Sequence, residues 1–418
     1  MIDTRCYYST NSISIRASGA ITQCCSVGKP IDNVNVFSES NDIINNPYIV
    51  SLRNDLNNGI KNNSCNGCWK NEDAGIASFR AGTGDLISEY NIPPIKKDVI
   101  TYDDLYWLDI DMGNKCNLAC RMCGPWASSL IAKQQYNLEK INGKPMSPTW
   151  VWVTGQAIET SISNSVRDKI FEIISKSNNL KRIHLYGGEP LLIDFHDELC
   201  EYLISTNRSK TISLTISSNL QVDLHRKLEL YNHFNKIHLS ISVDGIEDTY
   251  EYVRWPGKWE KLKRNIIEWA SVAKYHNEVT SSHYNTTITF VLQNINIDNI
   301  CNFLIEMQEL KVDNDILVER VWGTNLIEII PTRIIEDEIE KLNKLLKVNE
   351  SDVKFIDVIN NAKNLLESCI EPSKNLDRTN VIRFFDAQYQ HDIFQNRNLF
   401  TIKPYFLELA KQFNVDPW

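Results

Sequence analysis

Three cysteines lie close together in the first third of the chain. Cys116, Cys120 and Cys123 form a C-x3-C-x2-C set that directly follows an apolar stretch. Three thiolates on one short loop can bind three irons of a [4Fe–4S] cluster and leave the fourth iron open. An open iron allows a cluster to bind and reduce a ligand in addition to transferring electrons. An incomplete zinc site and a chance spacing are the alternatives.

The other cysteines are also concentrated near the beginning of the chain. Of eleven cysteines, eight precede residue 124. A disulfide scaffold is typical of short secreted chains, whereas this chain is long and begins without the apolar stretch of a secretion signal. We therefore expect a cytoplasmic protein whose early thiols bind metal or iron–sulfur clusters. Cys200, Cys301 and Cys369 stand alone in apolar or helical contexts, which predicts buried small hydrophobic residues.

A glycine pair follows the next apolar stretch, in Tyr-Gly-Gly-Glu-Pro at 186–190. Gly187 and Gly188 let the backbone approach a small ligand closely. The backbone carbonyls and Glu189 can accept hydrogen bonds from an ammonium group. Taken alone, the same segment is an ordinary turn from a strand into a helix.

Strands and helices alternate through the middle of the chain and would position these motifs. Apolar patterns predict strands at 105–112, 182–186, 211–217, 236–243 and 286–292, and helices at 165–175, 195–205, 222–234, 259–276 and 300–309. This alternation predicts an α/β fold with a parallel sheet, either open or closed into a barrel. Both motifs follow predicted strands, where the sites of such barrels are found.

We predict three segments along the chain. Residues 1–100 contain short irregular elements, with a strand-like alternation at 12–16. Residues 101–324 contain the α/β alternation. Residues 325–418 are predicted to be helical, with helices at 335–347, 352–369 and 378–390 and breaks at Pro372 and Pro404. This region is expected to form a packed appendage or a lid.

The composition excludes some classes of partner. Forty-four Lys and Arg residues against fifty-three Asp and Glu residues give a net charge of −9 among 418 residues, which disfavours nonspecific binding to nucleic acid. No apolar run approaches the roughly 18 residues that span a membrane. The composition therefore indicates a soluble protein that does not interact with membranes.

Together the motifs resemble the radical S-adenosylmethionine (SAM) superfamily. The resemblance covers about residues 104–320 and rests on the three cysteines, on 187–190, on the strand end at 215–219, and on 239–245 with Arg254. Met122 departs from the pattern, because the superfamily usually has an aromatic residue before the last cysteine. An apolar Met can still provide backbone and face contacts to the adenine.

The resemblance implies a partial (β/α)6 TIM-like barrel that binds a [4Fe–4S] cluster through Cys116, Cys120 and Cys123. It also implies a set of SAM-binding residues. Gly187, Gly188 and Glu189 would lie near the methionyl amine, Ser217 and Asn219 near the ribose, Ser242 and Arg254 near the carboxylate, and Met122 near the adenine. Reductive cleavage of SAM would yield methionine and a 5′-deoxyadenosyl radical that abstracts hydrogen from substrate. An ion-pair or surface arginine is the alternative for Arg254.

The N-terminal cysteines form a second motif, Cys6-x12-Gly19-x4-Cys24 followed by Cys65-x2-Cys68-Trp. The first half resembles the opening of SPASM and twitch auxiliary-cluster modules, and the whole is similar to radical SAM proteins with an N-terminal twitch domain. The resemblance implies an auxiliary iron–sulfur cluster on Cys6, Cys24, Cys65 and Cys68. Cys25 in place of Cys24 and a structural zinc site with four cysteines are the alternatives.

Two weaker groups of residues complete the candidates. Asp109 and Asp111 lie two residues apart on one predicted strand, so both face the same side. The two carboxylates would bind substrate, bind a cation or form hydrogen bonds with neighbouring polar groups of the barrel. Glu319, Arg320 and Trp322 follow an apolar stretch and are candidates for the substrate mouth.

The leading hypothesis is a radical SAM enzyme that carries out a redox modification with help from its auxiliary cluster. Its substrate would be a small metabolite, sugar, nucleoside or peptide, and its reductant a protein such as flavodoxin or ferredoxin. No residue identifies the substrate or a catalytic acid or base. The alternatives are an iron–sulfur electron-transfer or redox-sensing protein without SAM chemistry, and a binding protein whose fold is stabilised by a structural zinc ion.

Overall fold

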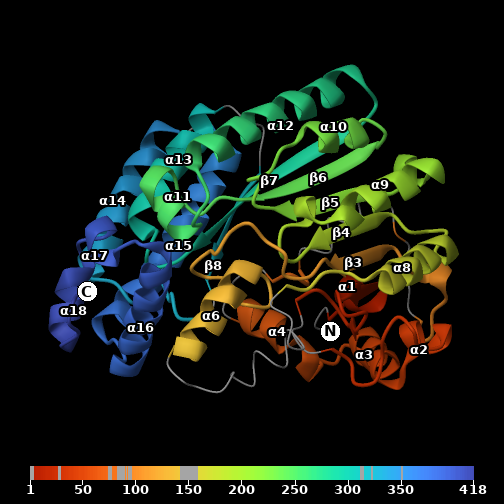
Figure 1. Cartoon of the computed structure of the whole chain (residues 1–418), viewed down its shortest axis with the longest axis horizontal. Helices are drawn as coiled ribbons and strands as arrows, with labels where there is room; N and C mark the ends of the chain where they lie inside the picture. The colour runs from red at the N-terminus through yellow and green to blue at the C-terminus, as the bar shows by residue number, and fades with distance from the viewer. Residues whose placement is uncertain are drawn as a thin grey trace. The chain divides into compact units, whose positions relative to one another are not determined.

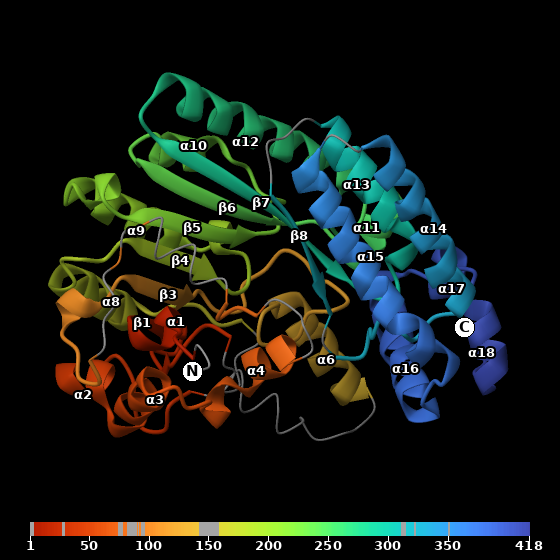
Figure 2. The same cartoon turned by 180° about the vertical axis from the view of Figure 1, so that it is seen from behind.

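The computed structural model describes residues 4–26, 30–73, 78–81, 90, 92, 97–141, 159–310, 315–321, 323–349 and 352–418. These residues form a mixed α/β fold with a parallel sheet and many helices (Figures 1 and 2). The chain divides into two compact units. Unit 1 comprises Met1–Lys115, Glu159–Ser217 and His225–His238, and unit 2 comprises Cys116–Ile158, Ser218–Leu224 and Leu239–Trp418. The three-segment division stays a prediction.

Unit 1 contains the first part of the sheet. Its strands follow the order β2 (Ile21–Thr22), β1 (Ser12–Ile15), β3 (Trp107–Asp111), β4 (Arg182–Tyr186) and β5 (Ser213–Ser218). β1 and β2 pair antiparallel as a hairpin, and β1, β3, β4 and β5 run parallel. The strand expected at 12–16 is therefore present, and it extends the main sheet.

The two faces of these strands differ in polarity because successive side chains point to opposite sides. One face is apolar, and each of its side chains is at most 3% exposed: Ile13, Ile15, Leu108, Ile110, Ile183, Leu185, Leu214 and Ile216. The other face is polar, with Ser14, Asp109, His184 and Thr215 aligned in one row across the four strands. The polar face of unit 1 therefore presents groups that can do chemistry.

The helices of unit 1 are α1 (Tyr7–Thr10), α2 (Ser40–Asn45), α3 (Pro47–Asn57), α4 (Asn66–Asp73), α8 (Asn164–Lys176), α9 (Asp194–Ser205) and α10 (His225–Tyr231). Ser163 caps α8 by accepting a hydrogen bond from the Val166 amide. Asn46 caps α3 in the same way, and Pro47 occupies its first turn. Figures 1 and 2 both show α8 and α9 beside β3, β4 and β5.

Unit 2 contains the parallel pair β7 (His283–Leu292) and β8 (Asp315–Arg320). β6 (Lys236–Ser242) precedes them and contributes residues to both units. The helices are α6 (Ser129–Ile141), α11 (Glu247–Val253), α12 (Trp259–Val279), α13 (Ile300–Glu309), α14 (Thr332–Val348), α15 (Val353–Lys374), α16 (Arg378–Gln395), α17 (Leu399–Ile402) and α18 (Phe406–Phe413). Short 3-10 turns occur at Asn63–Cys65, Tyr102–Asp104, Pro190–Leu192, Arg208–Lys210 and Ile297–Asn299.

The C-terminal helices share a core with the segment that follows β6. Tyr252 and Val253 at the end of α11 pack in one buried cluster with Phe384, Phe385 and Phe406 of α16 and α18. The expectation of a packed helical C-terminus is therefore confirmed. The sequence predicts a break at Pro372, but α15 continues to Lys374, since a proline in the final turn costs few hydrogen bonds. None of the helices in the described residues is long and apolar enough to cross a membrane.

Candidate functional site

The loop of Cys116, Cys120 and Cys123 lies in unit 2 and leads into α6. Backbone hydrogen bonds fix its course: the Ala119 amide donates to the Trp255 carbonyl (2.6 Å), and the Arg121 amide donates to the Val253 carbonyl (2.9 Å). All three cysteines are free thiols, and Cys120 is buried. The loop is therefore a fixed structure that does not depend on a disulfide.

The sulfur atoms of this loop accept hydrogen bonds from nitrogen donors. Cys116 Sγ lies 3.4 Å from the Leu118 amide and 3.7 Å from Asn219 Nδ2, and Cys120 Sγ lies 3.7 Å from Arg254 Nη1. Burial raises the pKa of the Cys120 thiol to about 12, while Arg254 acts to lower it. Donors of this kind stabilise thiolates. Cys116 and Cys120 have such donors, and the three cysteines of the loop together fit a [4Fe–4S] cluster.

Arg254 itself forms a buried ion pair. Its Nη2 lies 2.6 Å from Asp244 Oδ2, and the two side chains are 9% and 0% exposed. Asp244 also accepts a hydrogen bond from the Val291 amide (2.7 Å). The structure thus shows the ion pair that the sequence left open for Arg254, and it adds contact with Cys120. Arg254 Nε has no hydrogen-bond partner among the described residues and stays available to an anion.

The glycine turn lies in unit 1, directly against Lys115. Gly187 and Gly188 have φ angles of +84° and +56°, and the Glu189 amide donates to the Lys115 carbonyl (2.8 Å). Glu189 is fully buried, and its carboxylate accepts a hydrogen bond from the Leu191 amide (3.1 Å). The motif is therefore a tight turn packed on the residue that precedes Cys116.

Replacing Gly188 with alanine should destabilise this turn. A Cβ atom would lie 2.4 Å from the Lys115 carbonyl oxygen, and the φ angle is one that alanine rarely adopts. We expect a loss of about 1–3 kcal/mol in the free energy of unfolding, measured by denaturant titration. Gly323→Ala is the matched control, because Gly323 also has a positive φ but nothing lies within 4 Å of its Cβ position. An equal loss in both variants would show that the contact with Lys115 is irrelevant.

The remaining predicted SAM-binding residues occupy different settings. In unit 2, Asn219 donates to Asn117 Oδ1 (2.9 Å) and to Cys116, and Met122 packs against the core of the C-terminal helices. Ser242 is partly buried at the end of β6. In unit 1, Ser217 Oγ lies 3.0 Å from His184 Nε2. Of these four side chains, Asn219 is the one with a hydrogen bond to a cysteine of the loop, and the roles of all four toward SAM stay predictions.

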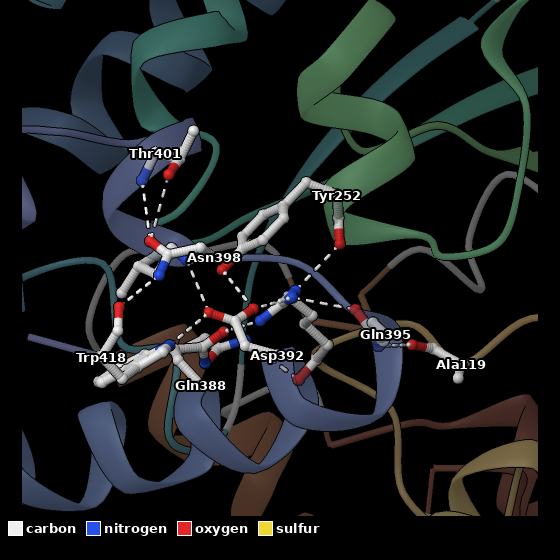
Figure 3. Close-up of polar contacts among 11 residues, drawn as sticks. Ala119, Tyr252, Gln388, Asp392, Gln395, Asn398, Thr401 and Trp418 are labelled. Carbon is white, nitrogen blue, oxygen red and sulfur yellow. Dashed lines mark hydrogen bonds and ion pairs between the residues drawn. The ribbon is translucent and has the colours of Figure 1, made fainter.

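A buried arginine ties the cysteine loop to the C-terminal helix α16. Arg121 lies between Cys120 and Cys123, and its Nη2 forms an ion pair with Asp392 Oδ1 (2.6 Å). It also donates to Gln388, Gln395 and the Tyr252 carbonyl. Figure 3 shows these partners converging on one point, with Trp418 also donating to Asp392 (2.9 Å). The sequence does not predict this network, because nothing local to Arg121 indicates where its partners lie.

The four N-terminal cysteines predicted as ligands come together in unit 1. Cys6, Cys24 and Cys65 belong to one buried cluster with Leu52, Leu56, Tyr8 and Trp69. Cys68 is close enough to raise the pKa of Cys6 and Cys65 electrostatically, after the larger effect of burial, and the pKa of Cys65 reaches about 12. Cys25 points elsewhere, toward Asp109 and His184.

The segment after Cys68 is held close to these cysteines. Arg80 forms an ion pair with Glu72 (2.5 Å) and lies 4.5 Å from the ring of Trp69. The Trp69 indole donates to the Asn62 carbonyl (2.9 Å). These contacts fix α4, which carries Cys68 in its first turn.

The other candidates have ordinary partners. Asp109 bonds to His184 (3.2 Å) and Asp111 to Arg16 (3.2 Å), so the two carboxylates face the same side and satisfy neighbouring groups. Arg320 pairs with Glu328 (2.9 Å), Glu319 is exposed, and Trp322 lies outside the described residues. Cys200, Cys301 and Cys369 are buried, as expected.

Comparison with known proteins identifies the domain that carries the cysteine loop. The sequence model of the Radical SAM superfamily matches residues 110–304, and no curated protein matches the chain. This chain therefore contains a radical SAM domain. Proteins of this superfamily bind a [4Fe–4S] cluster and SAM, and these are the cofactors of the domain.

Several solved structures are also similar to this chain. SuiB from Streptococcus suis bound to S-adenosylmethionine has 13% identity and a TM-score of 0.39 over 64% of this chain and 52% of SuiB. SuiB bound to the precursor peptide SuiA has 12% identity and a TM-score of 0.40 over 72% and 63%. TYW1 with a lysine–pyruvate adduct has 16% identity and a TM-score of 0.30 over 59% and 71%. The chain thus spans about half the length of the first of these proteins.

Proposed function

Since residues 110–304 form a radical SAM domain, we propose that this chain is an enzyme that cleaves SAM reductively and abstracts hydrogen from a substrate. The observation that carries the proposal is the fixed loop of Cys116, Cys120 and Cys123, in which nitrogen donors contact the sulfurs of Cys116 and Cys120. When bound and reduced, a cluster held by these cysteines would supply the electron for cleavage of the S–C5′ bond of SAM, which yields methionine and a 5′-deoxyadenosyl radical.

The chain's own residues hold and orient the reactants. Arg254 donates toward Cys120 and keeps one nitrogen for the SAM carboxylate, and the Asp244 carboxylate holds its guanidinium in place. The backbone carbonyls of the Gly187–Gly188 turn and the Glu189 carboxylate would accept hydrogen bonds from the SAM amine. Asn219 positions Cys116 and would reach the ribose, together with Ser217, while Ser242 would assist Arg254 and Met122 would contact the adenine. Fixed donors around a buried reactant hold the reacting atoms in line and exclude water.

The N-terminal cysteines would hold an auxiliary cluster. Tetrahedral zinc with Zn–S bonds of about 2.3 Å needs sulfur atoms about 3.8 Å apart. Cys25, Asp109 and His184 form the only group of three ligand-type side chains in the described residues whose ligand atoms lie within 4.8 Å of one another. Cys6, Cys24, Cys65 and Cys68 are therefore spaced more widely than zinc requires, which favours a cluster. An auxiliary cluster held by these cysteines would supply a one-electron acceptor, so that loss of a hydrogen atom to the 5′-deoxyadenosyl radical and of an electron to this acceptor would oxidise the substrate by two electrons.

The test of the function is SAM cleavage by the whole protein. The chain is reconstituted anaerobically with iron and sulfide, reduced with dithionite or flavodoxin, and given SAM. We expect 5′-deoxyadenosine, detected by liquid chromatography with mass spectrometry. An intact cluster spectrum without 5′-deoxyadenosine would favour the alternative, an iron–sulfur electron-transfer or redox-sensing protein. A small molecule or a peptide as substrate is then tested with deuterium-labelled candidates, because the label passes into 5′-deoxyadenosine.

The variant Cys65→Ala should separate the two clusters. Removing one of four auxiliary ligands should lower the iron content from about eight toward about four per chain. SAM cleavage should largely persist, since Cys116, Cys120 and Cys123 are unchanged, whereas substrate turnover should stop. Cys25→Ser is the control and should keep the full iron content, because its side chain points away from the cluster of Cys6, Cys24 and Cys65. Unchanged iron in Cys65→Ala would contradict the auxiliary cluster.

A further inference from the structure

The polar face of unit 1 carries a compact trio of metal-ligand side chains that the proposed function does not use. The Cys25 Sγ, an Asp109 carboxylate oxygen and a His184 ring nitrogen all lie within 4.8 Å of one another. They come from three different segments: the loop after β2, and the strands β3 and β4. Sulfur, imidazole and carboxylate together are ligands that Zn²⁺ and similar divalent ions accept.

The sheet register holds two of these ligands in place. Asp109 and His184 are direct partners across β3 and β4, and His184 Nδ1 lies 3.2 Å from Asp109 Oδ1. Ligand atoms around a tetrahedral zinc lie about 3.3–3.8 Å apart, given bonds of about 2.0–2.3 Å. The distance between Asp109 Oδ1 and His184 Nδ1 therefore already fits two ligands of one zinc ion. A small rotation of the Cys25 side chain would complete the set of three ligands.

The other nitrogen of His184 has the partner that a ligating histidine needs. Nε2 lies 3.0 Å from Ser217 Oγ, and the ring stacks on Tyr186 with centroids 5.3 Å apart. A hydrogen bond from the distal nitrogen fixes the tautomer that presents Nδ1 to a metal. Ser217 thus orients the imidazole toward Asp109 and Cys25.

An unused acceptor points to a missing cation. Asp109 is 1% exposed, and its Oδ2 has no hydrogen-bond partner among the described residues. A buried carboxylate oxygen without a partner is costly. The nearby cation Arg182 does not fill this role, because its hydrogen bonds go to Thr215 Oγ1 (2.8 Å) and the Tyr8 hydroxyl (3.4 Å).

We propose that Cys25, Asp109 and His184 bind one divalent transition-metal ion of the zinc class, with a fourth position open to water or to an oxygen atom of the substrate. Three protein ligands and one open position are the arrangement of catalytic zinc sites, whereas structural sites use four protein ligands. The inference does not rest on the proposed function, because it needs none of the cluster cysteines or SAM-binding residues except Ser217 as an outer partner.

The test measures zinc in the reconstituted protein. The chain is first loaded with iron and sulfide, then given one equivalent of Zn²⁺ and desalted, and metals are counted by mass spectrometry. We expect about one zinc per chain in the wild type and at least a tenfold weaker retention in His184→Gln, Asp109→Asn and Cys25→Ser. Ser217→Ala, which removes only the outer partner, should weaken retention about 10- to 100-fold. His225→Gln changes an exposed histidine and should retain zinc as the wild type does.

The ligand set gives a second readout that does not depend on how well a variant folds. Zinc-edge X-ray absorption of the wild type should show one sulfur and two or three nitrogen or oxygen neighbours. A shell of four sulfurs would place the zinc on the other cysteines and overturn the proposal. Absence of retained zinc in the wild type would also overturn it and leave Ser217, His184 and Asp109 as a hydrogen-bonded row. Formation of 5′-deoxyadenosine is measured separately, so failure of the metal site and failure of SAM cleavage are distinguishable.

Discussion

The variant Cys120→Ala will form no detectable 5′-deoxyadenosine under conditions in which the wild type does. Cys120 is the most enclosed of the three loop cysteines, at 7% exposure, and its sulfur is the one that Arg254 contacts. Alanine would remove the proposed iron ligand at the centre of the loop and leave the Arg254 guanidinium without that neighbour. Two remaining cysteines cannot hold a site-differentiated cube, so both the cluster and its reducing electron are lost.

The matched control for this prediction is Cys301→Ala. Cys301 is also a buried thiol in unit 2, at 5% exposure, but it lies in α13 and packs as a small hydrophobic residue. This control should lose some stability and keep SAM cleavage. The measurements are the yield of 5′-deoxyadenosine and the iron content per chain. Equal cleavage by wild type and Cys120→Ala would contradict the assignment of the cluster to this loop.

The sequence predicted the elements whose patterns are local. β4 and α13 have the predicted bounds, and α8, α9 and α12 agree within a few residues, because a buried strand or an amphipathic helix leaves its period in consecutive residues. The cysteine loop could be recognised for the same reason, since its three cysteines lie within eight residues. The fold class and the position of this motif were thus predictable from short-range patterns.

Long-range pairing was not predictable. β1 lies parallel to β3, which begins more than ninety residues later, and the alternation at 12–16 gives no information about its partner. The helices α2 and α3 formed where local signals were weak, because buried apolar residues of α3 such as Ile49 and Leu52 find partners elsewhere in unit 1. The trio of Cys25, Asp109 and His184 depends on the same pairing, since only the register of β3 and β4 places Asp109 beside His184.

The ion pair between Arg121 and Asp392 is the clearest example of a long-range contact that the sequence does not predict. The two side chains are 271 residues apart in the chain and are 0% and 1% exposed. The variant Asp392→Asn should destabilise unit 2 by about 3–5 kcal/mol, because it leaves a buried arginine without its counter-charge. Asparagine keeps the shape of the side chain, so the decrease in the free energy of unfolding measures the missing charge and the weaker hydrogen bonds. A neutral amide is also a weaker acceptor than a carboxylate for the hydrogen bonds that the Leu399 amide and the Trp418 indole donate to this side chain.

The control is the exposed ion pair of Arg333 and Glu408 in the same C-terminal region, where the side chains are 55% and 58% exposed. Glu408→Gln should lower the free energy of unfolding by no more than about 1 kcal/mol. Denaturant unfolding compares the two variants, and iron retained after gel filtration reports the loop. Because Arg121 lies between Cys120 and Cys123, two of the proposed cluster ligands, Asp392→Asn should also lose iron faster than Glu408→Gln. Equal stability and equal iron retention in the two variants would mean that α16 packs beside the cysteine loop without holding it.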